Sequence, residues 1–301
     1  MGNVIQTEKL VKTYKGKPAV DQLDLAVPEG SIYAYLGPNG AGKTTTIKLL
    51  MNMIFPTSGN AQVLGVPTSR IGMEQFQQMG YVSENQKVPG WMTVPQLINY
   101  CKPMYPTWDD EFCKRLLAQF DLPNDVKIKS MSRGMKVKAM LLSSLAYRPK
   151  LLVLDEPFSG LDPLVRDEFI RGILELTESE GWSIFVSSHD IDEVERLADW
   201  VGFIDKGKLQ VSENKESLQN RFRQMELVLP EGFTPPTLLP KEWINPEKSG
   251  HTFRFTEMDY GKQTPERMTS VFPTDLQAEE QALSLREIYL ALARHFKGGA
   301  Q

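Results

Sequence analysis

A glycine-rich loop at residues 37–44 constrains this 301-residue chain more than any other feature. It reads Gly-Pro-Asn-Gly-Ala-Gly-Lys-Thr and stands between an apolar run, Ser31–Leu36, that predicts a strand and a helical pattern from Thr44 to Ile54. Such glycines let backbone N–H groups turn inward at phosphate oxygens, and the following helix adds its positive N-terminal end. The sequence therefore predicts a phosphate-binding loop in which Lys43 contacts phosphate and Thr44 ligates Mg²⁺.

An apolar run that ends in two acidic residues supplies the second signal. Leu151–Leu154 predicts a buried strand, and Asp155 and Glu156 follow it directly. An aspartate at a strand end can hold Mg²⁺, often through water, and Glu156 is placed to accept a proton from an attacking water. His189 follows another predicted strand and can orient the γ-phosphate. Together with the glycine loop, these residues predict hydrolysis as well as binding.

The order of predicted elements divides the chain in two. Strands and helices alternate over residues 1–222, which predicts an α/β domain, and the pattern changes near residue 222. Residues 231–250 are rich in proline and glycine, and a last helix begins at Ser284, where Ser284 and Glu287 form a capping box. We therefore predict a second domain over residues 223–301. A role for it in dimerisation or regulation and a passive stabilising role remain equally open.

Composition indicates the cellular compartment and limits the classes of binding partner. A net charge of −4, from 34 basic and 38 acidic residues, gives no general electrostatic footprint for nucleic acid. The two cysteines, Cys101 and Cys113, fit a reducing compartment better than a disulfide framework. The N-terminus lacks the basic and apolar segments of a secretory signal, and no apolar run approaches the ~20 residues that span a bilayer. We expect another chain to supply any membrane part.

Taken in order, these motifs resemble those of the nucleotide-binding subunit of a bacterial exporter-type ATP-binding-cassette (ABC) transporter. The resemblance covers roughly residues 3–215. It implies an α/β fold with a P-loop NTPase core, an antiparallel β subdomain and a helical subdomain, followed by a small C-terminal α+β domain. It also implies ATP hydrolysis with ATP and Mg²⁺. The ATP-binding positions that it assigns are Tyr14, Val20, Asn39, Gly40, Ala41, Gly42, Lys43, Thr44 and Thr45.

The resemblance also assigns catalysis, metal binding and contact between subunits. Tyr14 would stack on the adenine ring, for which an aromatic face is chemically suited. Asp162 would lie in the loop that crosses between subunits. The remaining positions are Glu156 and His189 for catalysis, and Thr44, Asp155 and Glu84 for Mg²⁺.

The family's signature motif is altered in this chain. It normally reads Leu-Ser-Gly-Gly-Gln, and here it keeps Ser132 and Gly134 while Arg133 and Met135 replace the first glycine and the glutamine. A serine hydroxyl and a bare glycine backbone at the start of a helix suit a γ-phosphate. Arg133 adding charge at the phosphate and Arg133 pointing to solvent are equally open.

A second departure lies in the loop that couples the cassette to its membrane partner. Glu84 stands where the family usually has glutamine, with Gln86 two residues later. The carboxylate can still ligate Mg²⁺ or hold water. It also brings a negative charge near the γ-phosphate, which can weaken metal-free nucleotide binding.

The resemblance further implies that ATP binds between two cassettes arranged head to tail, as a homodimer or a pseudo-symmetric heterodimer. Each site would combine the glycine loop of one cassette with Ser132, Arg133, Gly134 and Met135 of the other. The expected partner is an integral membrane permease, not nucleic acid, and the expected location is cytoplasmic, on the inner face of the cell membrane. Aromatic residues concentrate in the helical stretch 87–128, which we expect to dock this partner. We expect most of them to form the core of a small helical subdomain and a minority to form the cleft for a partner helix.

Two other functions fit parts of the sequence. A soluble cassette acting on ribosomes or nucleic acid is one, although such factors usually carry two cassettes and a charged linker. A nucleotide-gated scaffold with little turnover is the other, and Glu156 and His189 argue against it. The cargo and the direction of transport depend on the membrane chain, although export is favoured.

Overall fold

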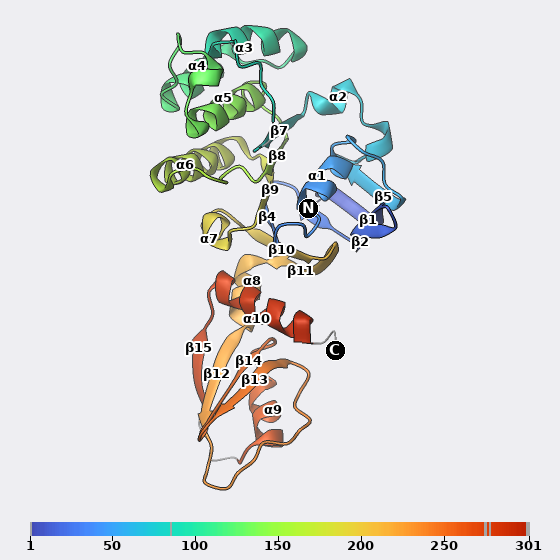
Figure 1. Cartoon of the computed structure of the whole chain (residues 1–301), viewed down its shortest axis with the longest axis vertical. Coiled ribbons are helices and arrows are strands. Elements are labelled where there is room, and N and C mark those ends of the chain that lie inside the picture. The colour runs from blue at the N-terminus through green and yellow to red at the C-terminus, as the bar shows by residue number, and fades with distance from the viewer. Residues whose placement is uncertain (1, 85, 274–275, 277, 299–301) are drawn as a thin grey trace. The chain divides into compact units, whose positions relative to one another are not determined.

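The computed structural model describes residues 2–84, 86–273, 276 and 278–298, and its chain folds into two compact units. The first unit is Met1–Ser212 and the second is Glu213–Gln301 (Figure 1). The units therefore meet about ten residues before the predicted domain boundary at 222. The division into functional domains at that boundary remains a prediction.

A six-stranded sheet forms the centre of the first unit (Figure 1). Its order is β11-β10-β4-β9-β8-β7, and the pairs from β10 to β7 are parallel. Every residue of β4, β8 and β9 is buried, as their continuous apolar sequences predict for strands covered on both faces. The strands are β4 (Ile32–Leu36), β7 (Met79–Ser83), β8 (Leu151–Asp155), β9 (Ser183–Ser188), β10 (Trp200–Asp205) and β11 (Lys208–Asn214).

Helices and a second sheet cover the two faces of the six-stranded sheet (Figure 1). On one side lie α1 (Lys43–Leu50) and an antiparallel sheet, whose apolar residues share a buried cluster with Tyr33, Tyr35 and Phe185 of the central strands. On the other side lie α6 (Pro163–Glu180) and α7 (Ile191–Val194). The antiparallel sheet comprises β1 (Asn3–Tyr14), β2 (Lys17–Leu23), β3 (Ala26–Pro28), β5 (Ser58–Val63) and β6 (Val66–Pro67).

Between β7 and β8 the chain forms the helical region that the resemblance implies. Apolar stripes of its helices pack together, and α5 also packs on β7. The region shows at the top of Figure 1. Its elements are α3 (Val94–Cys101), α4 (Asp110–Gln119) and α5 (Arg133–Leu145), with short turns η2 (Lys102–Met104) and η3 (Ile128–Ser130); η1 (Thr68–Arg70) and α2 (Met73–Phe76) precede β7.

The second unit is an antiparallel sheet in the order β13-β14-β12-β15 with three helices. One face packs Met225, Leu227, Phe253 and Phe255 into an apolar core, whereas the opposite face carries polar side chains. The elements are α8 (Lys215–Arg221), β12 (Arg223–Val228), β13 (Trp243–Ser249), β14 (Thr252–Glu257), α9 (Thr264–Val271), β15 (Ala278–Ala282) and α10 (Leu285–Gly298).

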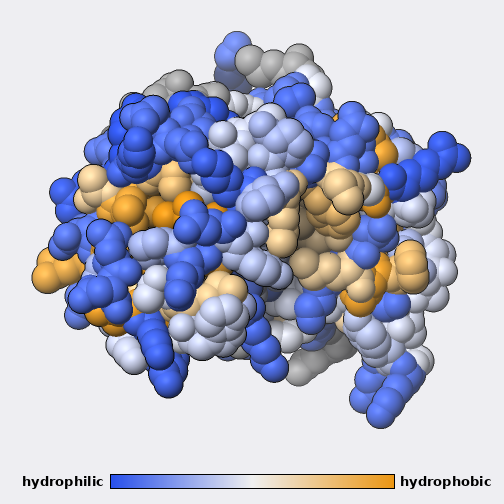
Figure 2. Space-filling view, turned by 90° about the horizontal axis from the view of Figure 1, so that it is seen from above, coloured by the Kyte–Doolittle hydropathy of each residue, from blue (hydrophilic) through white to orange (hydrophobic). Residues whose placement is uncertain are grey.

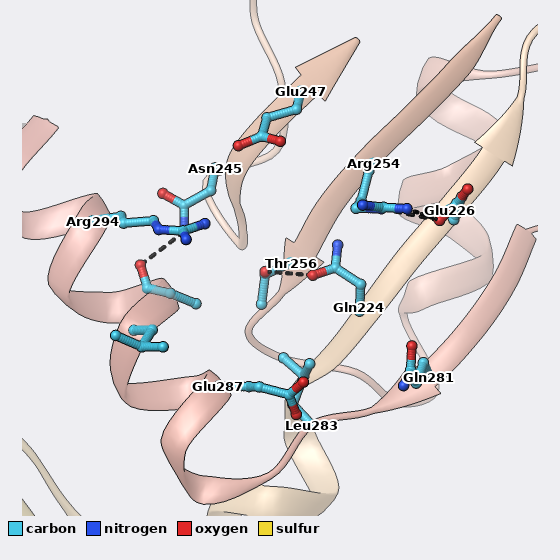
Figure 3. A pocket seen from close by; sticks show the side chains of 12 residues that line it. Gln224, Glu226, Asn245, Glu247, Arg254, Thr256, Gln281, Leu283, Glu287 and Arg294 are labelled. Carbon is cyan, nitrogen blue, oxygen red and sulfur yellow. Dashed lines mark hydrogen bonds and ion pairs between the residues drawn. The ribbon is translucent and has the colours of Figure 1, made fainter. Parts of the chain in front are cut away.

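A polar hollow of about 360 Å³ lies between α10 and the polar face of this sheet (Figure 3). Arg294 and Glu287 line it from α10, and Arg254 and Glu226 form an ion pair on the strands opposite. Asn245 donates a hydrogen bond from Nδ2 to the carbonyl of Ala291 at 2.8 Å. The ion pair thus joins β14 to β12, and the hydrogen bond joins β13 to α10.

The structure confirms the predicted fold class and the predicted capping box at Ser284. The hairpin of β10 and β11 turns at Lys206 and Gly207, both with positive φ (47° and 81°). The capping box of α10 is present, because the N–H and hydroxyl of Ser284 both donate to Glu287 Oε2 at 2.8 Å. In contrast, β13, α9 and β15 were not expected from the sequence, and β13 lies within the proline- and glycine-rich stretch 231–250.

Candidate functional site

Four predicted site segments follow four neighbouring strands of the central sheet. The order β4-β9-β8-β7 is all parallel, so these carboxyl ends meet at one edge of the sheet. The glycine loop follows β4, His189 follows β9, Asp155 ends β8 and Glu84 follows β7. Residues separated by more than one hundred positions in the sequence therefore reach one place.

The glycine loop folds back on its own lysine. Gly40 and Gly42 have positive φ (81° and 114°), and a side chain at Gly42 would collide with the backbone carbonyl of Ala19. Lys43 begins α1 and is 5% exposed. Its ammonium donates to the carbonyl oxygens of Gly37 at 2.7 Å and Pro38 at 3.2 Å. The loop thus holds a buried cation at the N-terminal end of a helix.

Asp155 is a buried carboxylate held by two hydroxyls. Thr44 Oγ1 donates to its Oδ1 at 3.2 Å and Ser187 Oγ donates to the same atom at 2.8 Å. Burial raises the pKa of Asp155 above its usual range, and the two hydroxyl donors partly counter this. A threonine hydroxyl beside a carboxylate matches the few protein ligands that Mg²⁺ takes when substrate phosphates complete its shell. These two side chains therefore fit a magnesium ion that enters with a nucleotide.

Glu156 connects the glycine loop to the predicted switch histidine. Its Oε1 lies 3.0 Å from Lys43 Nζ, and its Oε2 lies 2.7 Å from His189 Nδ1. The backbone N–H of His189 also donates to Oε2 at 3.3 Å. Glu156 itself has φ of 52°, a conformation that costs a non-glycine residue energy, and Ser187 holds it there by accepting its N–H. Strain of this kind is concentrated at functional sites.

These groups surround a hollow of about 280 Å³. It differs from the hollow of the second unit because its charged groups come from a phosphate-binding loop and two adjoining strand ends. The hollow beside α10 is also lined by a residue with positive φ, Asn245 (52°), but no glycine loop contributes to its described lining. We take the first as the candidate active site. Its lining residues are Ala19, Asn39, Gly40, Gly42, Lys43, Thr44, Thr45, Ser83, Glu84, Asp155 and Glu156.

Some predicted ATP-binding residues do not line this hollow. Ala41 is 3% exposed. Tyr14 is 47% exposed at the end of β1, with the Lys12 ammonium 5.3 Å from its ring centre. Val20 is fully buried in the core, and its neighbour Ala19 lines the hollow instead. A contact of Tyr14 with adenine remains a prediction, and so does the assignment of Val20.

The signature residues also lie outside the hollow and start a different helix. Ser132 caps α5 by accepting the N–H of Met135 at 3.2 Å, and its side chain is exposed. Gly134 packs so closely on Val165 that a Cβ there would lie 2.7 Å from Val165 Cγ1. Asp162 caps α6 by accepting the N–H of Leu164 at 2.9 Å. The chain therefore carries a second potential phosphate acceptor that does not face its own glycine loop.

The structure adds residues that the sequence did not single out. Ser187 holds both the side chain of Asp155 and the backbone of Glu156. Glu193 is buried, accepts a hydrogen bond from Ser188 at 2.9 Å and pairs with Arg166 of α6 at 3.3 Å. Burial raises the pKa of Glu193. The proximity of Ser187 and Ser188 to His189 was the available signal in the sequence.

The sequence is similar to a known protein family and to individual bacterial proteins. A family model described as ABC transporter matches residues 20–159. The bacitracin transport ATP-binding protein BcrA of Bacillus licheniformis is 34% identical over 229 residues, which cover 74% of each chain. The lantibiotic transport ATP-binding protein SrtF of Streptococcus pyogenes is 35% identical, over 72% of this chain and 96% of that protein.

Solved structures give the same architecture. An ATP-binding subunit of an ABC transporter superposes with a TM-score of 0.65 at 24% identity, covering 72% of this chain and 92% of that one. A dimeric cassette in a post-hydrolysis state, bound to ADP and Pi, has a TM-score of 0.63 at 19% identity, over 70% and 98% of the two chains. At these identities the likeness concerns the fold. Within the described part of the chain, no helix is long and apolar enough to cross a membrane.

Proposed function

Because the chain belongs to the ABC transporter family as an ATP-binding, ATP-hydrolysing subunit, we propose that its candidate site hydrolyses ATP only as half of a composite site. The observation that carries this proposal is the position of the two phosphate acceptors. Lys43 lies in the hollow, whereas Ser132 caps an exposed helix start outside it. A second copy of the chain, arranged head to tail, would bring its Ser132 and Gly134 to the γ-phosphate.

In this proposal the glycine loop binds the phosphates. The N–H groups of the loop and the N-terminal end of α1 favour the negative charge of the phosphates. Lys43 breaks its ion pair with Glu156 and then pairs with the β- and γ-phosphates. Thr44 and Asp155 hold Mg²⁺, which supplies charge neutralisation at the phosphates when bound. Glu84 stays within reach of the same hollow.

Glu156 and His189 then act on the attacking water. Once Lys43 has moved to the phosphates, Glu156 has a free oxygen that accepts a proton from that water. His189 keeps Glu156 in place through Nδ1 and is itself half-exposed, although it does not line the hollow. Because Glu156 is fixed by Ser187 and His189 together, its carboxylate is oriented before ATP arrives.

For a membrane partner, we propose docking on exposed apolar side chains of the helical region and α2. Phe112 is buried and Tyr105 stacks on Tyr147, so these aromatic residues belong to the core of the region. Figure 2 shows apolar side chains among hydrophilic ones on the face seen from above. The exposed large apolar and aromatic residues of the helical region and α2 are Met73, Phe76, Trp91, Tyr100 and Met104. Surfaces of this kind mark binding sites for other proteins.

The transport task is proposed from relatives. Their names refer to bacitracin, lantibiotic and multidrug transport, which supports a permease that moves such compounds, with export as the direction. A subunit that drives such a permease would be cytoplasmic and peripheral on the inner face of the membrane.

Co-purification tests the proposed function. The full chain should be recovered from membranes with a permease and should hydrolyse ATP in its presence. A chain that binds ATP with its permease but shows no turnover would instead support the nucleotide-gated scaffold.

A further inference from the structure

Arg133 and Glu84 form an ion pair within one copy of the chain. The guanidinium Nη2 of Arg133 donates to Oε1 of Glu84, although the residues lie 49 positions apart. Both positions are those at which the chain departs from the family pattern. The glycine and the glutamine usually found there could not make such a pair. The structure thus joins two substitutions that the sequence presented separately.

The guanidinium of Arg133 also lies close to the loop after β8. Gly160 has φ of 65°, and a Cβ on it would lie 2.5 Å from Arg133 Nη1. Arg133 therefore lies over Gly160 while it reaches Glu84. With 47% of its side chain exposed, the pair contributes little to the stability of the fold. The pair is therefore more important for the net charge of the candidate active site than for stability.

Glu84 is one of three carboxylates in the candidate active site. Among the described residues that line the hollow, Glu84, Asp155 and Glu156 face a single cation, Lys43. The backbone N–H of Glu84 donates to the carbonyl of Asp155 at 3.1 Å, which fixes Glu84 beside the proposed metal site. A nucleotide brings several further negative charges to this place. Without compensation, the carboxylate of Glu84 opposes its binding.

We propose that Arg133 is a positioning residue that neutralises and holds Glu84 of its own chain, so that a glutamate at this position is compatible with ATP binding. This inference rests on the proposed function, because it concerns the same site. It assigns Arg133 a role in its own copy, whereas Ser132 and Gly134 act on the ATP of the second copy. It also predicts that the benefit of Arg133 depends on the charge of Glu84.

Four variants of the full chain test this dependence: R133Q, R133K, E84Q and the double variant R133Q/E84Q. R133Q should raise the KM for ATP by about five-fold, with a smaller effect on kcat, because the carboxylate of Glu84 is no longer neutralised and opposes ATP binding. R133K should stay near the wild-type KM. The double variant should return to the KM of E84Q, since no carboxylate remains to be neutralised.

Binding measured without turnover separates this inference from the proposed function. Affinity for the fluorescent analogue trinitrophenyl-ATP should fall in R133Q, and by more without Mg²⁺ than with it. A matched control is R254Q, which breaks the Arg254–Glu226 pair of similar exposure in the second unit (Figure 3) and should leave affinity unchanged.

The outcomes are distinct. If wild-type protein binds the analogue but does not hydrolyse ATP with its permease, the proposed function is wrong. In that case, the affinities of the variants for the analogue still test the inference. Equal losses in R133Q and R133Q/E84Q, relative to wild type and E84Q, would overturn the inference and indicate that Arg133 contacts the phosphate of the second copy directly.

Discussion

The chain carries two helix starts suited to phosphate, and they differ in how their own chain treats them. At the glycine loop, Lys43 and Thr44 are engaged with Glu156 and Asp155 in one hollow, where Lys43 and Asp155 are buried. At the signature, Ser132 is exposed and faces no carboxylate hollow of its own. The first helix start is organised as a binding site within its own chain, whereas the second is exposed and available to contact another chain. This difference is what makes a composite site between two copies the natural account.

The largest expected effect is at the lysine of the glycine loop. Lys43→Ala should lower ATP affinity by about a hundred-fold or more, because it removes the only cation among the described residues that line the hollow. Isothermal titration with ATP and Mg²⁺ measures this. Lys48→Ala, on the exposed side of the same helix α1, is the matched control and should bind normally. Equal losses in both would mean that the loop was disrupted as a whole.

Glu156→Gln should separate binding from turnover. Loss of the proton acceptor should reduce kcat by about a hundred- to a thousand-fold. Affinity for ATP should rise, because Lys43 no longer has to leave a carboxylate 3.0 Å away. Steady-state kinetics and titration on the same preparation check both signs. Wild-type turnover in this variant would refute the assignment of Glu156 as the base.

The signature can be tested without disturbing its helix. Aspartate and asparagine both cap helices well, so Ser132→Asp and Ser132→Asn should both preserve α5. Only the aspartate adds a charge that repels phosphate, so it should lower turnover at least about ten-fold further than the asparagine. ATP hydrolysis and far-UV circular dichroism of both variants provide the comparison. Equal activity would show that Ser132 does not approach a phosphate.

The smallest expected effect is on folding stability, through the buried carboxylate of Asp155 beside the glycine loop. Burial raises the pKa of Asp155, so the folded chain binds this proton more tightly than the unfolded chain does. Ionisation of Asp155 therefore costs stability at pH values above the raised pKa, and the cost disappears as pH falls below the ordinary value of 3.8. Asp155→Asn removes it, because the hydroxyls of Thr44 and Ser187 can still donate to the amide oxygen.

Nucleotide-free Asp155→Asn protein should accordingly melt above the wild type at neutral pH, with a difference that shrinks as the pH is lowered. Thermal unfolding at a series of pH values measures it. Ser132→Asn should show no such pH-dependent difference, which sharpens the contrast between the two helix starts. A lower melting temperature for Asp155→Asn at neutral pH would contradict the account.

The parts of the fold that the sequence predicted are those set by local pattern. The buried strands and the phosphate loop are read from continuous apolar runs and from glycines whose positive φ the structure shows. In contrast, β15 has the sequence Ala-Glu-Glu-Gln-Ala, without apolar alternation, and is a strand only because β12 pairs with it. Helix α5 starts at Arg133, directly after the signature serine, because the Ser132 side chain caps it.

Within the site too, the sequence did not predict which residues far apart in the chain contact one another. Each motif was recognisable by itself, but the Glu156–His189 contact depends on the order of strands in the sheet, and the Arg133–Glu84 pair depends on the packing of α5 near β7. Sequence spacing does not specify that order. The two readings of Arg133, at the phosphate or toward solvent, therefore both missed its partner in the same chain.

Mixing two inactive variants tests the composite site most directly. Lys43→Ala and Ser132→Asp proteins are each expected to be inactive alone. If the glycine loop of one copy works with the signature of another, a mixed dimer contains one fully intact site, so an equal mixture should recover about a quarter of wild-type ATP turnover. If each copy uses its own signature, no intact site forms, and turnover that stays at the level of the separate variants would contradict the account.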